Sequence, residues 1–195
     1  MTTPFTISTA TPLDIPAITT LIATSVRTLQ APDYAPAQID NALATVFTVD
    51  TQLIADGTYF LARAPSGELA GCGGWSFRKT LYGGDHDLTR AHTHTPTKEP
   101  ARLNPLTDAA KIRAIFVHPS FARQGLGSLL LAAAEDAAIA DGFTRFEMGS
   151  TLTGVALYTL KGYRELSRTE TPIGAGQTIT VVHMTKDTRQ SNSAS

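Results

Sequence analysis

The sequence predicts an α/β (α+β) fold that combines helices with about six to seven strands. Two observations lead to this prediction. Short apolar runs rich in β-branched or aromatic residues recur along the chain between turn residues, which is typical of strands. Other segments carry apolar residues every three to four positions, which is typical of helices. Because the 195 residues show no internal repeat and no linker, we expect one domain over residues 1–187 and a flexible tail over residues 188–195.

The first part of the chain predicts one strand and two helices. Residues 5–9 alternate between polar and apolar side chains and indicate a strand. Residues 10–29 have apolar side chains at helical spacing, with Pro16 in the first turn, where a proline is tolerated. Residues 35–47 repeat the helical pattern after a Pro/Asp/Tyr break.

A hairpin is predicted next. We expect residues 52–64 to form a strand that a turn at Asp56-Gly57 interrupts. Residues 69–77 then return as its partner strand, because Pro65-Ser66-Gly67 is typical of a tight turn.

A polar stretch over residues 79–109 interrupts this pattern and predicts a loop insertion. It carries His86, His92 and His94, with Asp85 and Asp87 beside the first of them. A metal site is disfavoured, because a His-x-His pair alone lacks the further ligands and rigid scaffold that a metal needs. A substrate lid and a solvated surface insertion both stay open.

Residues 111–141 read as a strand, a glycine-bearing turn and a helix. The apolar run Ile112–Val117 predicts a buried strand, which Pro119 ends. Gly125 and Gly127 lie where the following helix begins. A turn of this kind collects free backbone N–H groups at the positive end of a helix dipole, and glycine allows a ligand to approach the backbone closely. The segment therefore predicts a phosphate-bearing ligand.

The last part of the chain predicts a strand, a short helix and an antiparallel strand pair. Residues 144–148 indicate the strand, and residues 152–161 a helix that Gly162 ends. Residues 163–168 and 178–184 are expected to pair around a turn over residues 172–176.

Composition limits the classes of function. The formal net charge is −1 and no dense basic run is present, so nucleic acid is not an expected partner. No apolar run approaches the ~18 residues of a membrane span, and no secretory signal precedes the first strand. Cys72 is the single cysteine, so no intrachain disulfide can form, and we expect a cytoplasmic protein.

Three segments resemble the GNAT superfamily (GCN5-related, acyl-CoA-dependent N-acetyltransferases). Thr9–Leu21 resembles its opening strand and helix, and Val117–Gly127 resembles its coenzyme A pyrophosphate loop. Gly154–Tyr163 resembles its segment with a tyrosine between an alanine and a glycine, and residues 182–186 are similar to its last strand. The order of elements also matches over nearly the whole chain, with residues 79–109 as an insertion. The dinucleotide and Walker motifs do not fit, because their third glycine and their Gly-Lys-Ser/Thr are absent.

The resemblance implies a central mixed, mostly antiparallel sheet of about six to seven strands, with helices on both faces and a V-shaped splay between two central strands. It implies acetyl-CoA as the cosubstrate and no metal. It leaves open whether the protein forms a homodimer. The residues implied to bind the cofactor are Ile115, Phe116 and Val117 for the pantetheine arm and the amides of Ala122, Arg123, Gln124, Gly125, Leu126, Gly127 and Ser128 for the pyrophosphate. The chain departs from the family's usual residues at Ala122, Thr151 and Gly154.

Tyr158 is implied to be the catalytic general acid that protonates the departing thiolate, with a structural hydroxyl as the alternative. A tyrosine is protonated at neutral pH, as an acid must be. No motif in the sequence identifies the general base; His118 and Glu147 are candidates for this role. Trp75, Tyr34 and Phe116 are candidates for the acceptor pocket or the core, and Cys72 is expected in the core.

We therefore expect an N-acetyltransferase that moves acetyl from acetyl-CoA to a primary amine of a small molecule or peptide by direct attack in a ternary complex. No nucleic-acid or membrane partner is expected. The alternative is a non-catalytic acyl-CoA-binding or regulatory module on the same fold.

Overall fold

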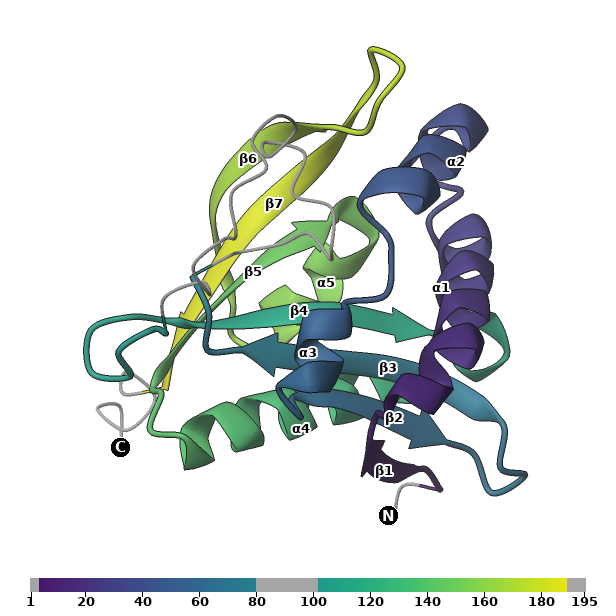
Figure 1. Ribbon diagram of the computed structural model, residues 1–195. Helices are drawn as coiled ribbons and strands as arrows, with labels where there is room; N and C mark the ends of the chain where they lie inside the picture. The colour runs from purple at the N-terminus through teal and green to yellow at the C-terminus, as the bar shows by residue number, and fades with distance from the viewer. Residues whose placement is uncertain (1–3, 80–101, 189–195) are drawn as a thin grey trace, which may run out of the picture.

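A computed structural model describes residues 4–79 and 102–188 and places them around one sheet of seven strands (Figure 1). The strand order is β1-β2-β3-β4-β5-β7-β6. The strands are β1 (Thr6–Thr9), β2 (Tyr59–Arg63), β3 (Leu69–Ser76), β4 (Ala110–Val117), β5 (Arg145–Thr151), β6 (Arg164–Pro172) and β7 (Thr178–Asp187). All neighbouring strands pair antiparallel except β4 and β5, which are parallel. The predicted mixed, mostly antiparallel sheet is confirmed.

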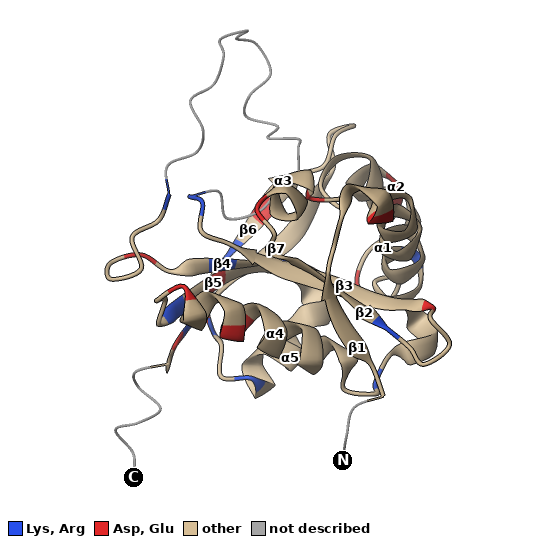
Figure 2. Ribbon diagram, turned by 60° about the horizontal axis from the view of Figure 1, so that its bottom comes forward, with Lys and Arg blue, Asp and Glu red and all other residues tan. Residues whose placement is uncertain are grey.

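Helices cover both faces of the sheet (Figures 1 and 2). One face carries α1 (Ile15–Leu29), α2 (Pro36–Thr45) and α3 (Thr51–Ala55), and the other carries α4 (Leu126–Ala140) and α5 (Val155–Leu160). Single 3-10 turns lie at Pro12–Asp14, Pro119–Phe121 and Leu152–Gly154. The apolar side of α1, which includes Ile18 and Ile22, packs on β3 and β4, whereas Leu131 and Ala134 of α4 pack on the opposite face. Helix α1 therefore buries one apolar stripe, as its spacing predicts.

The prediction of one strand over residues 52–64 was wrong in its first half. Residues 51–55 form α3, and only residues 59–63 form strand β2. The helix begins because the side chain of Asp50 accepts a hydrogen bond from the Leu53 N–H at 3.2 Å, which caps the first turn. The hairpin of β2 and β3 is confirmed. Residues 85–94, with the histidines considered as ligands, lie outside the described residues.

β4 and β5 diverge in the middle of the sheet, as the predicted splay requires. They pair only at Ala110↔Phe146 and Lys111↔Glu147. Beyond these pairs β4 stays with β3 and β5 stays with β7. The two central strands therefore open a gap along their carboxyl ends.

A β-bulge lies where the two strands separate. On β3 the register moves from Cys72↔Phe116 to Gly74↔Arg113, so that one residue of β3 opposes two residues of β4. Ala114 in the bulge has φ +56°, an unusual value for a residue with a side chain. The Tyr59 hydroxyl donates to Cys72 Sγ (3.2 Å), and the Cys72 thiol donates to the Ala114 carbonyl (3.8 Å). These hydrogen bonds thus stabilise the strained backbone at Ala114.

In the described part of the chain, no helix combines the length and apolar character that crossing a membrane requires.

Candidate active site

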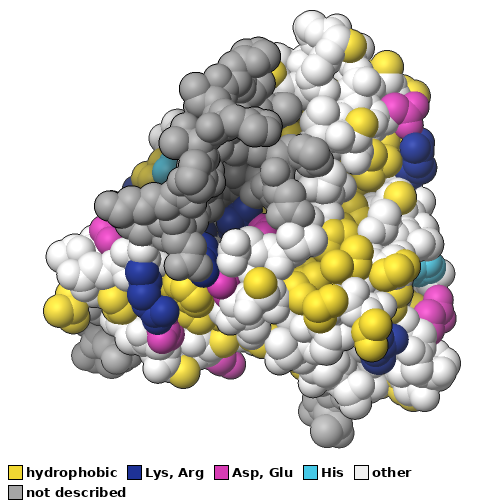
Figure 3. All heavy atoms as spheres, viewed as in Figure 1, with side chains coloured by type: hydrophobic (Ala, Val, Ile, Leu, Met, Phe, Trp, Pro, Cys, Tyr) yellow, Lys and Arg dark blue, Asp and Glu magenta, His cyan; other side chains and the backbone are white. Residues whose placement is uncertain are grey.

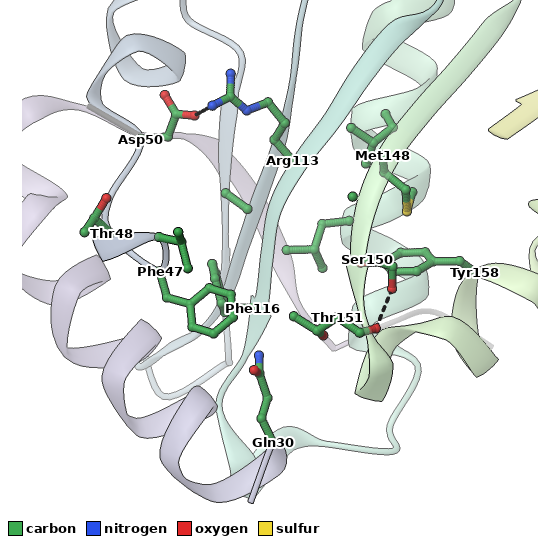
Figure 4. Close-up of a pocket in the computed structure, with 15 residues that line it drawn as sticks. Gln30, Phe47, Thr48, Asp50, Arg113, Phe116, Met148, Ser150, Thr151 and Tyr158 are labelled. Atoms are coloured by element: carbon green, nitrogen blue, oxygen red, sulfur yellow. Dashed lines mark hydrogen bonds and ion pairs between the residues drawn. The ribbon is translucent and has the colours of Figure 1, made fainter. Parts of the chain in front are cut away.

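A cavity occupies the gap between β4 and β5 (Figure 4). Its empty volume is about 740 Å³, part of which is open to solvent. Three groups of residues line it, from α1 and the segment between α2 and α3, from β4, and from β5 with α5. They are Gln30, Val46, Phe47, Thr48, Asp50, Ile112, Arg113, Ala114, Ile115, Phe116, Met148, Gly149, Ser150, Thr151 and Tyr158. The cavity therefore lies at the bulge and brings together residues that are far apart in the sequence.

The glycine turn leads from the end of β4 into α4. Arg123 and Gly125 have φ values of +63° and +82°, so the backbone turns through the left-handed region twice before the helix begins. The first helical hydrogen bond runs from the Leu129 N–H to the Gly125 carbonyl at 3.0 Å. The N–H groups of Leu126, Gly127 and Ser128 precede that bond and lie at the positive end of the helix dipole. This arrangement can hold an anion.

The side chains of the turn contribute differently. The Gln124 amide donates to the Ser120 carbonyl at 3.1 Å, and Arg123 is exposed. At Gly127 a Cβ would lie 3.0 Å from Leu157, the residue before Tyr158. The first turn of α4 therefore packs directly against α5, and Gly127 permits the close approach.

Tyr158 reaches the cavity from α5 and lies beside Ser150 (Figure 4). The residue is 9% exposed, and burial raises the pKa of its hydroxyl to about 12. Gly154 makes room for the ring, because a Cβ there would lie 2.7 Å from Tyr158 Cε2 and 2.8 Å from Ser150 Oγ. The glycine at this position therefore allows the tyrosine ring to lie beside Ser150.

A buried ion pair crosses the cavity wall. Arg113 of β4 and Asp50 lie 2.7 Å apart, with side chains 6% and 4% exposed. Asp50 also caps α3. The pair therefore ties the segment between α2 and α3 to the strand at the bulge and leaves this part of the cavity without net charge.

The structure brings together part of the set that the sequence predicted. Ile115, Phe116 and Tyr158 line the cavity, and Val117 and residues 122–128 continue from β4 toward α4. The carbonyl and N–H groups of Ile115 in the bulge are displaced from the regular ladder.

Other candidates lie away from the cavity. His118 accepts a hydrogen bond from the Ser120 N–H at 3.3 Å in the turn after β4, and Glu147 pairs with Lys111 at 2.5 Å. Tyr34 is buried and donates to the Thr180 carbonyl at 2.8 Å, while Trp75 packs edge-on to Phe143. Each of the four has a structural partner outside the lining of the cavity.

Cys72 is buried, and burial raises the pKa of its thiol to about 12. It is a core residue, as expected, and not a nucleophile at neutral pH.

Sequence reasoning missed the side of the cavity formed by Gln30, Phe47, Thr48 and Asp50. None of these residues lies in a recognisable motif. Only the helix end at Gln30 and the capping residue Asp50 leave a local signal, and neither signal indicates a cavity.

Comparison with known proteins agrees with this geometry. The model of the acetyltransferase (GNAT) family matches residues 24–163. No curated protein matches the chain by sequence. Among the described residues, no group of three or more His, Cys, Asp or Glu side chains could hold a metal ion.

Solved structures share the fold at low sequence identity. A GCN5-related N-acetyltransferase from Rhodopseudomonas palustris is 20% identical, with a TM-score of 0.69 over 96% of this chain and 97% of that one. The PaiA N-acetyltransferase from Thermoplasma acidophilum, solved in complex with coenzyme A, is 13% identical, with a TM-score of 0.60 over 96% and 99%. A chimera of the spermidine N-acetyltransferase SpeG from Vibrio cholerae and hSSAT is 15% identical, with a TM-score of 0.58 over 96% and 97%. The family match spans more than half of the chain, and the splayed sheet agrees with it: the chain belongs to the acetyltransferase (GNAT) family.

Proposed function

We propose that the chain is an N-acetyltransferase that moves an acetyl group from acetyl-CoA to a primary amine of a small molecule or peptide, by direct attack in a ternary complex. One observation carries the proposal. Tyr158 and the bulged part of β4 line one cavity, and the glycine turn leads from the end of β4 into α4, whose first turn packs on Leu157, the residue before Tyr158. A thioester cofactor with a pyrophosphate at one end and an acetyl group at the other fits that sequence of features.

The residues take the following roles in the proposal. The amides of residues 122–128 hold the pyrophosphate, and the backbone of Ile115, Phe116 and Val117 binds the pantetheine arm as an added strand would. The bulge at Ala114 frees backbone groups of β4 from the ladder for this purpose. The PaiA neighbour was solved with coenzyme A, which supports the same cofactor here.

In the proposed chemical step, Tyr158 supplies the proton that the leaving thiolate takes up. The amine nitrogen forms a bond to the carbonyl carbon, the carbon–sulfur bond breaks, and the thiolate leaves with the electron pair. Tyr158 donates its hydroxyl proton to the thiolate and regains a proton from water, while the amine loses its surplus proton to water. Burial supports this role because it keeps the hydroxyl protonated.

Calorimetric titration with acetyl-CoA, followed by thiol release in the presence of amines, tests the proposal. We expect acetyl-CoA binding and amine-dependent thiol release. Binding without release against any amine would favour the non-catalytic acyl-CoA-binding module on the same fold. An absence of binding would reject both functions.

A further inference from the structure

The side chain of Tyr34 joins parts of the molecule that are far apart in the sequence. Its hydroxyl donates to the Thr180 carbonyl of β7 at 2.8 Å and accepts from the Leu152 N–H at 2.9 Å. The backbone N–H of the same residue donates to the Gln30 carbonyl at the end of α1, at 3.1 Å. Tyr34 therefore ties the end of α1 both to β7 and to the turn that precedes α5.

The two segments joined in this way lie on different sides of the cavity. Gln30 lines it from the end of α1, and Thr151 lines it from the end of β5 (Figure 4). A second hydrogen bond, from the Thr153 hydroxyl to the Asp33 carboxylate, joins the same two segments. The arrangement of these two sides of the cavity therefore depends on a small set of polar contacts.

The Leu152 N–H lies at the start of the helical segment that carries Tyr158. Leu152–Gly154 form a single 3-10 turn, and α5 follows directly from Val155. The first N–H groups of a helical segment have no acceptor within that segment. The Tyr34 hydroxyl supplies an acceptor from 118 positions earlier in the chain. It therefore caps the segment from outside.

The position of this turn determines where the Tyr158 ring lies. A Cβ at Gly154, the last residue of the turn, would lie 2.7 Å from Tyr158 Cε2 and 2.8 Å from Ser150 Oγ. The ring thus packs directly on the backbone of the turn. A displacement of the turn would therefore displace the ring and its hydroxyl.

Tyr34 is suited to fix a position because it is buried and its bonds are directional. The residue is 5% exposed, and burial raises the pKa of its hydroxyl, so the group stays neutral and can donate and accept at once. Apolar side chains gather on the surface between α1 and α3 (Figure 3), but apolar contacts are non-directional. The hydrogen bonds of Tyr34 therefore set how the end of α1 lies relative to the turn before α5.

We propose that Tyr34 is a positioning residue for Tyr158. Through the Leu152 N–H it holds the turn before α5 and, with that turn, the hydroxyl that protonates the thiolate. Tyr34 does not line the cavity, so it acts through Tyr158 and not on the substrates. The inference rests on the proposed function and adds a residue on which the same catalytic step depends.

A double-mutant cycle of Tyr34→Phe and Tyr158→Phe tests this route. Phenylalanine keeps the ring at position 34 and removes only the hydroxyl. With an amine that supports thiol release, Tyr34→Phe alone should lower kcat about tenfold, because a small displacement of a catalytic group is costly. In the Tyr158→Phe background the same change should alter kcat by less than about twofold, since the hydroxyl to be positioned is already absent. Equal fold losses in both backgrounds would overturn the inference.

Hydrogen exchange provides a readout that does not depend on activity. Tyr34→Phe should accelerate amide exchange over residues 152–158, because it removes the outside cap. Gln38→Leu is the matched control: Gln38 Nε2 donates to the Thr178 carbonyl at 2.7 Å, so this change also removes a bond to β7 but none to Leu152. It should leave kcat and the exchange of residues 152–158 unchanged. Unchanged exchange in Tyr34→Phe would overturn the inference.

A second variant covers the case in which Tyr34→Phe does not fold. Thr153→Val removes the other hydrogen bond between the two segments at an exposed position and leaves the core intact. It should lower kcat by a smaller factor, and only where Tyr158 is present; an equal loss in the Tyr158→Phe background would overturn the inference. A parent protein that releases no thiol with any amine would reject the proposed function and the inference together, whereas an active parent with independent losses would reject the inference alone.

Discussion

Tyr158 is a buried tyrosine that lines the cavity. Tyr163, whose ring packs on that of Tyr158, provides a matched control. The rings of Tyr158 and Tyr163 lie 6.0 Å apart, but only Tyr158 lines the cavity. We predict that Tyr158→Phe lowers kcat about 100-fold, because the departing thiolate loses its proton donor. The Kd for acetyl-CoA, measured by calorimetry, should stay within about twofold. Tyr163→Phe should leave kcat close to the parent value; equal losses in the two variants would assign Tyr158 a structural role.

In the proposed mechanism, the raised pKa of Tyr158 predicts how the rate depends on pH. An acid must be protonated to act, and a pKa of about 12 keeps this hydroxyl protonated throughout the usual assay range. We therefore predict that kcat at saturating amine does not fall between about pH 7 and pH 10. A rate profile over this range checks the prediction. A decrease with a midpoint below about pH 9 that Tyr158→Phe abolishes would show that the hydroxyl ionises much earlier.

Gly154 controls where the Tyr158 ring lies. Its φ of −83° suits any residue, so the main effect of a side chain is the contact of 2.7 Å with the ring. We predict that Gly154→Ala lowers kcat about tenfold by displacing the hydroxyl, with little change in acetyl-CoA affinity. Parallel measurement of kcat and of the Kd separates the two effects. An unchanged kcat would mean that the ring tolerates the methyl group without moving.

At the scale of the elements, the start of α4 is predicted to bind the pyrophosphate, and two glycines test it. Gly125 and Gly57 have φ values of +82° and +71°, and a Cβ at either one would meet no atom within 4 Å. Alanine should therefore cost a similar ~1–2 kcal/mol of backbone strain at each position. Gly125→Ala should weaken acetyl-CoA binding about tenfold because it turns the first amides of α4, and Gly57→Ala should not. Equal affinities of the two variants would place the pyrophosphate elsewhere.

Most elements were predictable because local patterns specify them. The helical spacing of α1 and α2 and the turn at Pro65-Ser66-Gly67 are local signals that do not depend on the rest of the fold. Helix α3 was missed because its five residues are too few to show a helical period, and Leu53 and Ile54 side by side suit a buried strand equally well. The capping hydrogen bond from the Leu53 N–H to the Asp50 carboxylate favours the helix, and the sequence does not reveal this bond.

At the scale of the whole molecule, the pair of Asp50 and Arg113 joins the helical layer to the sheet. Removing one partner of a buried pair leaves an uncompensated charge, which costs about 3–5 kcal/mol. We predict a loss of this size for Asp50→Asn, in which asparagine keeps the capping acceptor. Asp40→Asn removes an exposed pair with Arg27, whose side chains are 60% and 58% exposed, and should cost less than about 1 kcal/mol. Urea unfolding measures both, and a similar small loss in the two variants would contradict the prediction.

The sequence predicts only the side of the candidate site that β4, the glycine turn and the tyrosine segment form. The glycine turn and the tyrosine segment are contiguous in the sequence, so Gly125, Gly127 and Tyr158 could be recognised. Gln30 and Thr48 meet the cavity only because α1 and the segment after α2 fold over the end of β4. Contacts between residues that are far apart in the sequence produce no local pattern, so the sequence alone does not predict them.

Direct transfer in a ternary complex is the central claim, and the initial-velocity pattern tests it most directly. Thiol release is measured over a grid of acetyl-CoA and amine concentrations, with an amine that supports thiol release, and the mass of the protein is measured after incubation with acetyl-CoA alone. We predict intersecting double-reciprocal lines and a protein of unchanged mass. Parallel lines together with an acetylated protein would show a covalent intermediate and contradict the account.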